Sequence, residues 1–216
     1  MKILCQYPTR GRRKRFLNTF IDYVYKARNS EKIIFNFVVD IDDETMNTIS
    51  ILETAKNYKL MISDNKSKIE AINNMPKNIE WDILLLISDD MIPQVNGWDN
   101  IIREDMQKYY PDLDGVLWYN DGYAGNRLNT LVCMGRKYYE RFGYIYHPAY
   151  KSLYADNEFM EVANKLGKQT YIDNVIIKHE HPANTGKPYD ERYRITESFY
   201  QEDKTTYEKR KLAGFK

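Results

Sequence analysis

Cysteine is scarce in this sequence. The 216 residues include two cysteines, Cys5 and Cys133, and each lies within an apolar run. Secreted disulfide scaffolds carry more cysteines than this, so we interpret the pair as buried thiols in a reducing compartment. The cysteine content therefore argues against a small, cross-linked extracellular domain.

Long hydrophobic runs and an excess of one charge are also missing. No window approaches the roughly 18 apolar residues of a membrane span, and the N-terminus turns basic too early for a signal peptide. The 32 basic and 31 acidic residues give a net charge of +1, so no overall field draws the chain to nucleic acid. We expect a soluble, cytoplasmic protein with no membrane partner.

The most informative stretch covers residues 81–98. Five apolar residues, 83–87, run directly into Ser88, Asp89 and Asp90. An unbroken apolar run predicts a strand covered on both faces, as in a mostly parallel sheet. Ligands of such sheets bind outside the carboxyl ends of the strands, where the two aspartates lie. The alternative is an ordinary strand end, because Ser and Asp also begin turns.

Strands and helices alternate along the first half of the chain. We expect strands over 2–6, 32–39, 59–63 and 81–88, and helices over 15–27, near 45–55, over 66–75 and over 98–110. This alternation predicts an α/β fold with a central, mostly parallel sheet flanked by helices.

The second half of the chain predicts a smaller part in which strands and helices are mixed. We expect strands over 115–120, 130–134 and 170–177, with helices over 135–141 and 157–166. The polar residues 183–216 can form a flexible lid, a docked helix or a partly disordered tail.

Polar residues follow the first two strands. The loop at 7–12 contains one glycine and the cations Arg10 and Arg12, which suit an anionic or planar ligand. A single glycine excludes a dinucleotide fingerprint or a P-loop, and surface arginines at a helix start remain the alternative. Asp40 and Asp42 follow the strand at 32–39, where an acid can also cap the next helix.

Taken in order, these segments resemble a glycosyltransferase of the GT-A fold, similar to the inverting group often called family 2. The resemblance covers residues 1–182. It rests on the loop at 7–12, the acids at 40–43, Ser88-Asp89-Asp90 in place of a DxD motif, Asp156 with Glu158 in place of an ED pair, and His179 with His181. A strict DxD motif would need an aspartate at Ser88, and Asp156 follows an alanine rather than an acid.

The resemblance implies one GT-A-like, Rossmann-like domain over 1–182. Residues 1–110 would bind the nucleotide sugar, 111–182 the acceptor, and 183–216 would form a polar tail or lid. The implied activity is metal-dependent transfer of a hexosyl group from a UDP- or GDP-sugar to an acceptor hydroxyl, with inversion. The acceptor stays open between a glycan, a protein and a modified DNA base.

The resemblance also implies roles for individual residues. The residues that would bind the donor are Pro8, Thr9, Arg10, Arg12, Asp40, Asp42, Lys68 and Asp89. Asp90 would bind Mn²⁺ or Mg²⁺ with His179, and His181 is a further candidate; an imidazole ligand favours Mn²⁺. Asp156 would act as general base, although it could instead cap the helix predicted over 157–166.

Two other functions remain open from the sequence. A nucleotidyltransferase would also use paired acids and a metal, but it predicts a glycine-rich first loop. A non-catalytic module that binds carbohydrate or nucleic acid would explain the incomplete acidic motifs. The sequence does not distinguish the donor sugar, its base or the oligomeric state.

Overall fold

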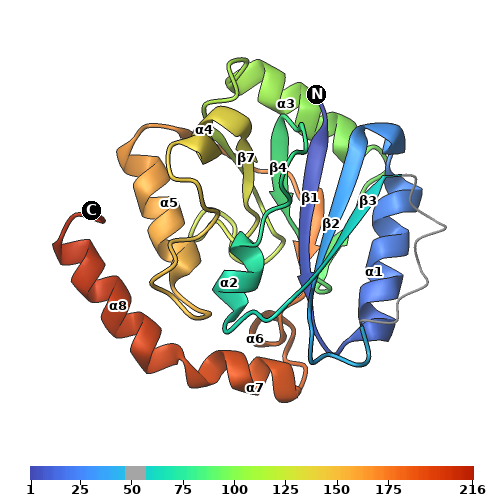
Figure 1. The fold of residues 1–216 in the computed structure, drawn as a ribbon. Helices are drawn as coiled ribbons and strands as arrows, with labels where there is room; N and C mark the ends of the chain where they lie inside the picture. Colours follow the sequence, from blue (N-terminus) through green and yellow to red (C-terminus); the bar gives the residue numbers. More distant parts are fainter. Residues whose placement is uncertain (47–56) are drawn as a thin grey trace.

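The computed structural model describes residues 1–46 and 57–216. Within these ranges, the central sheet contains, in spatial order, β3 (Tyr58–Ser63), β2 (Ile33–Asp40), β1 (Ile3–Thr9), β4 (Ile83–Leu86), β7 (Cys133–Gly135), β6 (Val116–Tyr119) and β8 (Gln169–Ile172). Helices flank this sheet (Figure 1) and confirm the predicted α/β architecture. Beyond residue 46, the helix expected near 45–55 lies outside the described residues.

The first four strands along the chain are parallel. β1 pairs with β2 on one side and with β4 on the other, and β3 extends the sheet beyond β2. β1 continues to Thr9, three residues beyond the predicted strand at 2–6. Pro8 is tolerated there because the pairing of β1 with β4 has already ended at Gln6. β4 is shorter than the predicted strand over 81–88.

The other half of the sheet is mixed. β7 lies antiparallel between β4 and β6, whereas β8 is parallel to β6. The prediction of one strand over 170–177 is wrong, because the chain turns after Ile172, where Asn174 donates its backbone N–H to the Ile172 carbonyl. The chain then forms β9 (Ile177–His179), which pairs with β5 (Met91–Pro93) in a separate two-stranded sheet.

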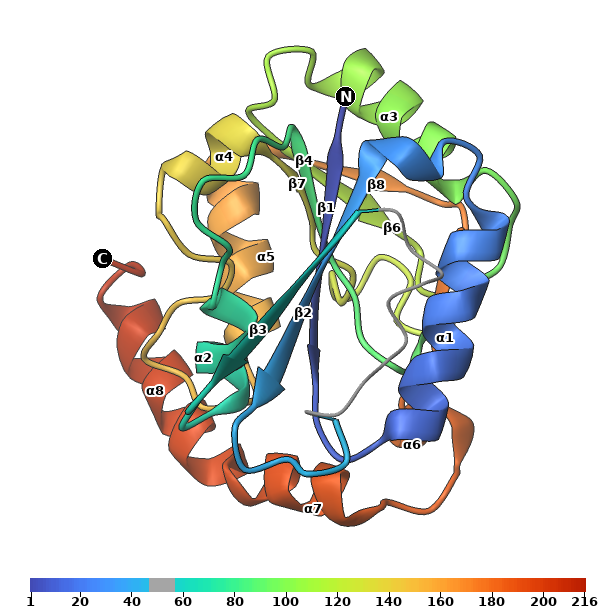
Figure 2. The ribbon, with the colours of Figure 1, turned by 45° about the vertical axis from the view of Figure 1, so that its right-hand side comes forward.

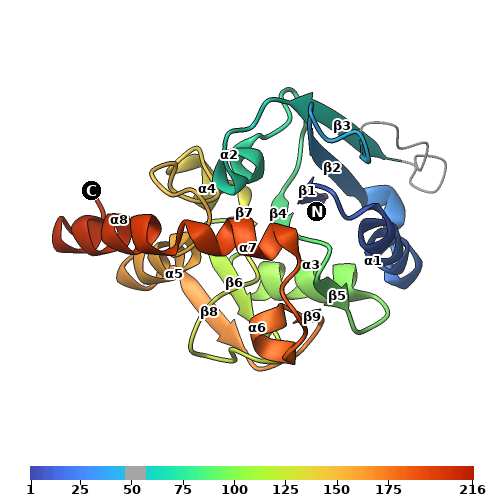
Figure 3. The same ribbon diagram turned by 90° about the horizontal axis from the view of Figure 1, so that it is seen from below.

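Helices cover both faces of the central sheet (Figures 1 and 3). One face carries α1 (Arg13–Lys26) and α3 (Trp98–Tyr109), and the other carries α2 (Lys68–Asn73), α4 (Arg136–Glu140) and α5 (Ala155–Lys165). Alternate side chains of β1 point to opposite faces of the sheet. Cys5 belongs to the core cluster with the aromatic residues of α1, and Leu4 belongs to the cluster with α2 and α5. As expected, Cys5 and Cys133 are buried free thiols.

The last part of the chain is helical. It contains α6 (Pro182–Thr185), α7 (Glu191–Ser198) and α8 (Tyr200–Leu212). Figure 2 shows this tail passing beneath the sheet and rising beside α5, and Figure 3 shows α7 near the carboxyl ends of β1 and β4. Arg210 of α8 forms an ion pair with Glu158 of α5 at 2.7 Å. In the described part of the chain, no helix has the length and apolar character to cross a membrane.

Candidate functional site

The ends of β1 and β2 bring three of the expected donor-binding residues together. The Arg10 guanidinium donates to Asp40 and to Asp42, each at 2.6 Å. Asn65, which follows β3, donates to the other carboxylate oxygen of Asp40 at 2.8 Å. The parallel strands therefore place a cation and two acids at one edge of the sheet, as the sequence predicts.

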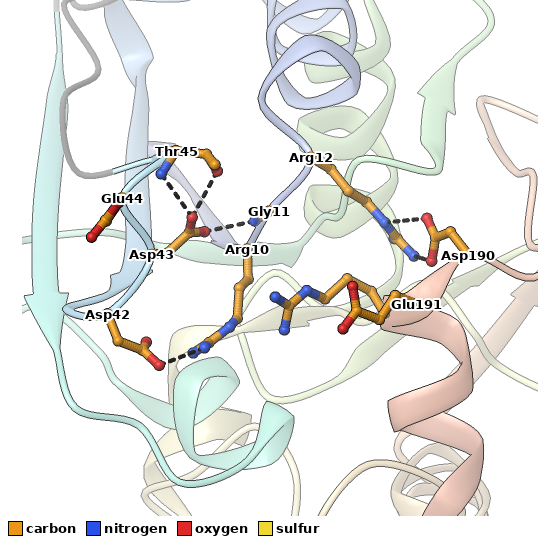
Figure 4. Close-up of a pocket in the computed structure, with 10 residues that line it drawn as sticks. Arg10, Gly11, Arg12, Asp42, Asp43, Glu44, Thr45, Asp190 and Glu191 are labelled. Atoms are coloured by element: carbon orange, nitrogen blue, oxygen red, sulfur yellow. Dashed lines mark hydrogen bonds and ion pairs between the residues drawn. The ribbon is translucent and has the colours of Figure 1, made fainter.

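A polar pocket of about 410 Å³ opens beside Arg10 (Figure 4). It is lined by Arg10, Gly11, Arg12, Asp42, Asp43, Glu44, Thr45, Asp190, Glu191 and Arg192. Gly11 has a φ of 68°, which favours glycine, and its N–H donates to Asp43 at 2.6 Å. The pocket thus lies between the loops after β1 and β2 and the N-terminal end of α7.

Asp90 and His179 meet beside this pocket. The pairing of β5 with β9 sets Met91 opposite His179, so Asp90 Oδ2 lies 3.7 Å from His179 Nε2. Ser88 and Tyr193 also donate to the Asp90 carboxylate, the Tyr193 hydroxyl at 2.7 Å. Burial alone would raise the pKa of Asp90, but His179 and the two hydroxyl donors hold that pKa well below its usual range.

Asp89 has other partners than Asp90. Its carboxylate accepts from Arg12 at 3.2 Å, and its backbone carbonyl accepts from Thr19 and Arg15 of α1. Burial raises the pKa of Asp89 to about 6, while the Arg12 charge opposes the rise. The two neighbouring aspartates therefore contact different partners, and Asp90 is the one beside His179.

Asp156, the expected base, lies on α5. The helix begins at Ala155, so Asp156 is in its first turn, and the residue at the N-cap is Tyr154. Burial raises the pKa of Asp156, and the nearby charges of Lys68 on α2 and, more weakly, His179 oppose the rise. Lys68 and His179 therefore both act electrostatically on Asp156, although the three residues come from different elements.

The remaining expected residues are less open to a ligand. Thr9 is buried within β1 rather than in the loop, and Pro8 pairs with Val38 of β2. His181 uses Nδ1 to accept from the Ala183 N–H at the start of α6. Burial lowers the pKa of His181 to about 4, so this side chain is neutral near pH 7.

Sequence reasoning missed the part played by α7. Arg12 donates to both carboxylate oxygens of Asp190, at 2.7 and 2.9 Å, and its guanidinium lies 3.9 Å from the centre of the Tyr193 ring. The Tyr193 hydroxyl reaches Asp90, 103 positions earlier in the chain. The sequence signal was limited to Asp190 three residues before Tyr193, which is typical of a helix N-cap.

The side chains near Asp90 fit an ion that takes most of its ligands from diphosphate and water. Within residues 1–46 and 57–216, no group of three or more His, Cys, Asp or Glu side chains is gathered for a metal. A carboxylate and an imidazole are present in Asp90 and His179, and both are ligands that Mn²⁺ accepts. His179 Nδ1 is buried and has no hydrogen-bond partner among the described residues.

No protein-family model and no curated protein matches the sequence. Solved structures do match the fold. A mannosyltransferase from Pyrobaculum calidifontis, in complex with GDP-Man and Mn²⁺, aligns with a TM-score of 0.66 and 10% identity over 82% of this chain and 56% of its own. Residues 1–349 of TarS from S. aureus, in complex with UDP-GlcNAc, align with a TM-score of 0.65 and 12% identity. This alignment covers 88% of this chain and 62% of the TarS chain. This chain has the GT-A fold.

The GT-A domain spans only part of its structural neighbours, 56% and 62% of those two chains. At such low identity, the alignments establish the fold, and the function has to be argued from the site. Beyond the carboxyl ends of β1 and β4, this GT-A domain brings Arg12 to Asp89 and His179 to Asp90.

Proposed function

We propose that the protein is a glycosyltransferase that moves a sugar from a nucleoside diphosphate to an acceptor hydroxyl. The observation that carries this proposal is the Asp90–His179 pair, whose partner Tyr193 packs against Arg12 of the polar pocket. The ligands bound in its structural neighbours, GDP-Man and UDP-GlcNAc, support a nucleotide-sugar donor.

The pocket supplies the groups that a donor needs. Asp40 and Asp42 can accept from ribose hydroxyls or from base N–H groups, and Arg10 donates to both in the absence of a ligand. Arg12 and the exposed Lys68 can pair with diphosphate oxygens. Donor binding then replaces contacts within the protein by contacts with the nucleotide.

Asp90 and His179 would hold a Mn²⁺ or Mg²⁺ ion. When bound, the ion would neutralise the charge that develops on the leaving diphosphate. Asp90 is suited to this position because its low pKa keeps it ionised across the neutral range. His179 adds a nitrogen ligand, which favours Mn²⁺.

Asp156 would serve as the base. The acceptor oxygen forms a bond to the anomeric carbon while the bond from that carbon to the diphosphate oxygen breaks, and the hydroxyl proton passes to Asp156. Direct displacement of this kind inverts the anomeric centre. Burial raises the pKa of Asp156, which strengthens it as a proton acceptor above that pKa.

Thermal unfolding with UDP, GDP and their sugar conjugates tests the proposal, with and without Mn²⁺. A ligand at 100 times its Kd adds about 2.7 kcal/mol to the unfolding free energy. We expect a Mn²⁺-dependent shift for one nucleotide, lost in Asp90→Ala and kept in Glu104→Gln, which changes an exposed carboxylate on α3. Unchanged Mn²⁺-dependent binding and transfer in Asp90→Ala would contradict the proposal.

A further inference from the structure

The carboxylate of Asp203, on α8, is fully buried and binds a stretch of backbone. It accepts from three consecutive N–H groups, those of Lys151 at 2.8 Å, Ser152 at 2.8 Å and Leu153 at 2.7 Å. Among the described residues, no basic side chain forms an ion pair with Asp203. Hydrogen bonds from the backbone therefore stabilise its charge, as in charge-assisted contacts of this type.

The segment that Asp203 holds leads directly to Asp156. Leu153 is followed by Tyr154, whose φ of 59° lies in the left-handed region that non-glycine residues rarely adopt. Helix α5 begins at the next residue, with Asp156 in its first turn. The direction in which α5 starts thus depends on how the backbone before Tyr154 is held.

The same segment is also attached to α2. The carbonyl of Lys151 accepts the N–H of Ile69 at 3.2 Å, and Ile69 follows Lys68. The backbone that Asp203 binds therefore joins α2, which carries Lys68, to α5, which carries Asp156.

Docking of α8 does not by itself require a buried acid. Arg210 pairs with Glu158 at 2.7 and 2.8 Å, and Lys211 pairs with Glu161 at 2.7 Å, so two ion pairs join α8 to α5. An unpaired buried carboxylate is costly unless its hydrogen bonds are well made. The geometry of Asp203 instead fits a role in fixing one backbone conformation.

We propose that Asp203 is a positioning residue that orients the base Asp156. Through Asp203, helix α8 would contribute to catalysis. This inference rests on the proposed function, in which Asp156 receives the proton of the acceptor hydroxyl. Asp203 touches neither donor nor acceptor, so it should affect the rate of transfer and leave donor affinity unchanged.

The main variant is Asp203→Asn, which keeps the shape but places an NH₂ group against backbone N–H donors. We expect kcat to fall at least tenfold, while the Kd for the nucleoside diphosphate with Mn²⁺, measured by calorimetry, stays within twofold. The matched control is Lys211→Met, which removes an ion pair between α8 and α5 without touching residues 151–153. It should keep both values near those of the wild type.

A second variant distinguishes a loss of positioning from a loss of folding. Asp203→Glu keeps the charge but displaces the carboxylate, and it should lower kcat several-fold with unchanged nucleotide binding. A wild-type kcat in this folded variant and in Asp203→Asn would overturn the proposal. Equal losses of kcat and nucleotide affinity, or an equal loss of kcat in Lys211→Met, would reduce Asp203 to a docking contact and also overturn it.

Asp156→Asn separates this inference from the function on which it rests. If Asp156→Asn abolishes transfer and the Asp203 variants do not impair it, only the positioning role fails. If Asp156→Asn transfers sugar at the wild-type rate, the assigned base is wrong and the positioning role falls with it.

Discussion

The hydroxyl of Tyr193 competes for the carboxylate that we assign to the metal. It donates to Asp90 Oδ2 at 2.7 Å, on the side that also faces His179. Both groups are buried, and a hydrogen bond to a charged group contributes about 1.5–3 kcal/mol. Tyr193→Phe removes this bond while Ser88 and His179 still contact Asp90, so it should destabilise the free protein by about 1.5 kcal/mol, the lower end of this range.

The same change should strengthen ligand binding. A metal that takes Asp90 as ligand must displace or redirect the Tyr193 hydroxyl, and that cost disappears in the phenylalanine variant. Because about 1.4 kcal/mol corresponds to a factor of ten, we expect Mn²⁺ and nucleotide together to bind up to about tenfold more tightly. Thermal unfolding without ligand and calorimetry with ligand should thus change in opposite directions.

Tyr189→Phe is the matched control. Its ring lies 5.9 Å from that of Tyr193, so it belongs to the same aromatic cluster without providing the hydroxyl on Asp90. It should leave Mn²⁺ affinity unchanged. Weaker Mn²⁺ and nucleotide binding in Tyr193→Phe would refute the reasoning, because the hydroxyl would then assist the ligand rather than compete with it.

Three further predictions concern pH and packing. The Arg141 and Lys168 partners hold the pKa of Asp114 at about 2, and both are about one-third exposed, so Asp114→Asn should cost about 1–2 kcal/mol at pH 7. Because this pKa is depressed, the stabilisation is present above about pH 4 and is lost as pH falls toward 2. The unfolding free energies of the wild type and of Asp114→Asn should therefore converge near pH 2. Burial raises the pKa of Asp156, so kcat/KM should decline on acidification at a higher pH than for an ordinary carboxyl group, and Asp156→Asn should lower kcat at least about 100-fold. Met106 is fully buried in α3, so Met106→Ala should lower the unfolding free energy by about 2–5 kcal/mol, measured in urea.

The first half of the fold was predictable because its signals are local. The apolar run at 83–87 forms most of a strand buried on both faces, and within 15–27 the predicted Phe16 and Phe20 lie on the buried face of α1, although Tyr25 is exposed. Parallel strands then require Asp40 and Asp90 to lie at the same edge. Chain order and apolar periodicity were sufficient for these inferences.

The missed features depend on contacts between distant residues. The chain over 170–177 looks like one apolar strand, and only the polar turn at Asp173 divides it between two sheets. The pairing of β5 with β9, which brings His179 to Asp90, is three residues long and has no periodicity to detect. Composition alone marked 183–216 as polar, although Asp203 and Tyr193 there are buried.

The two helices of the tail reach different sides of the site by different means. α7 engages the donor side through Asp190, which is half exposed, and through the Tyr193 hydroxyl, and both contacts are polar groups that a diphosphate and a metal can replace. α8 engages the base side through the buried Asp203 and through ion pairs with α5, none of which a donor resembles. A donor can therefore loosen α7 while α8 still holds the backbone before Asp156. Under the proposed function, Asp156 would then keep its orientation during donor entry, because the contacts of α7 and those of α8 are made by different residues.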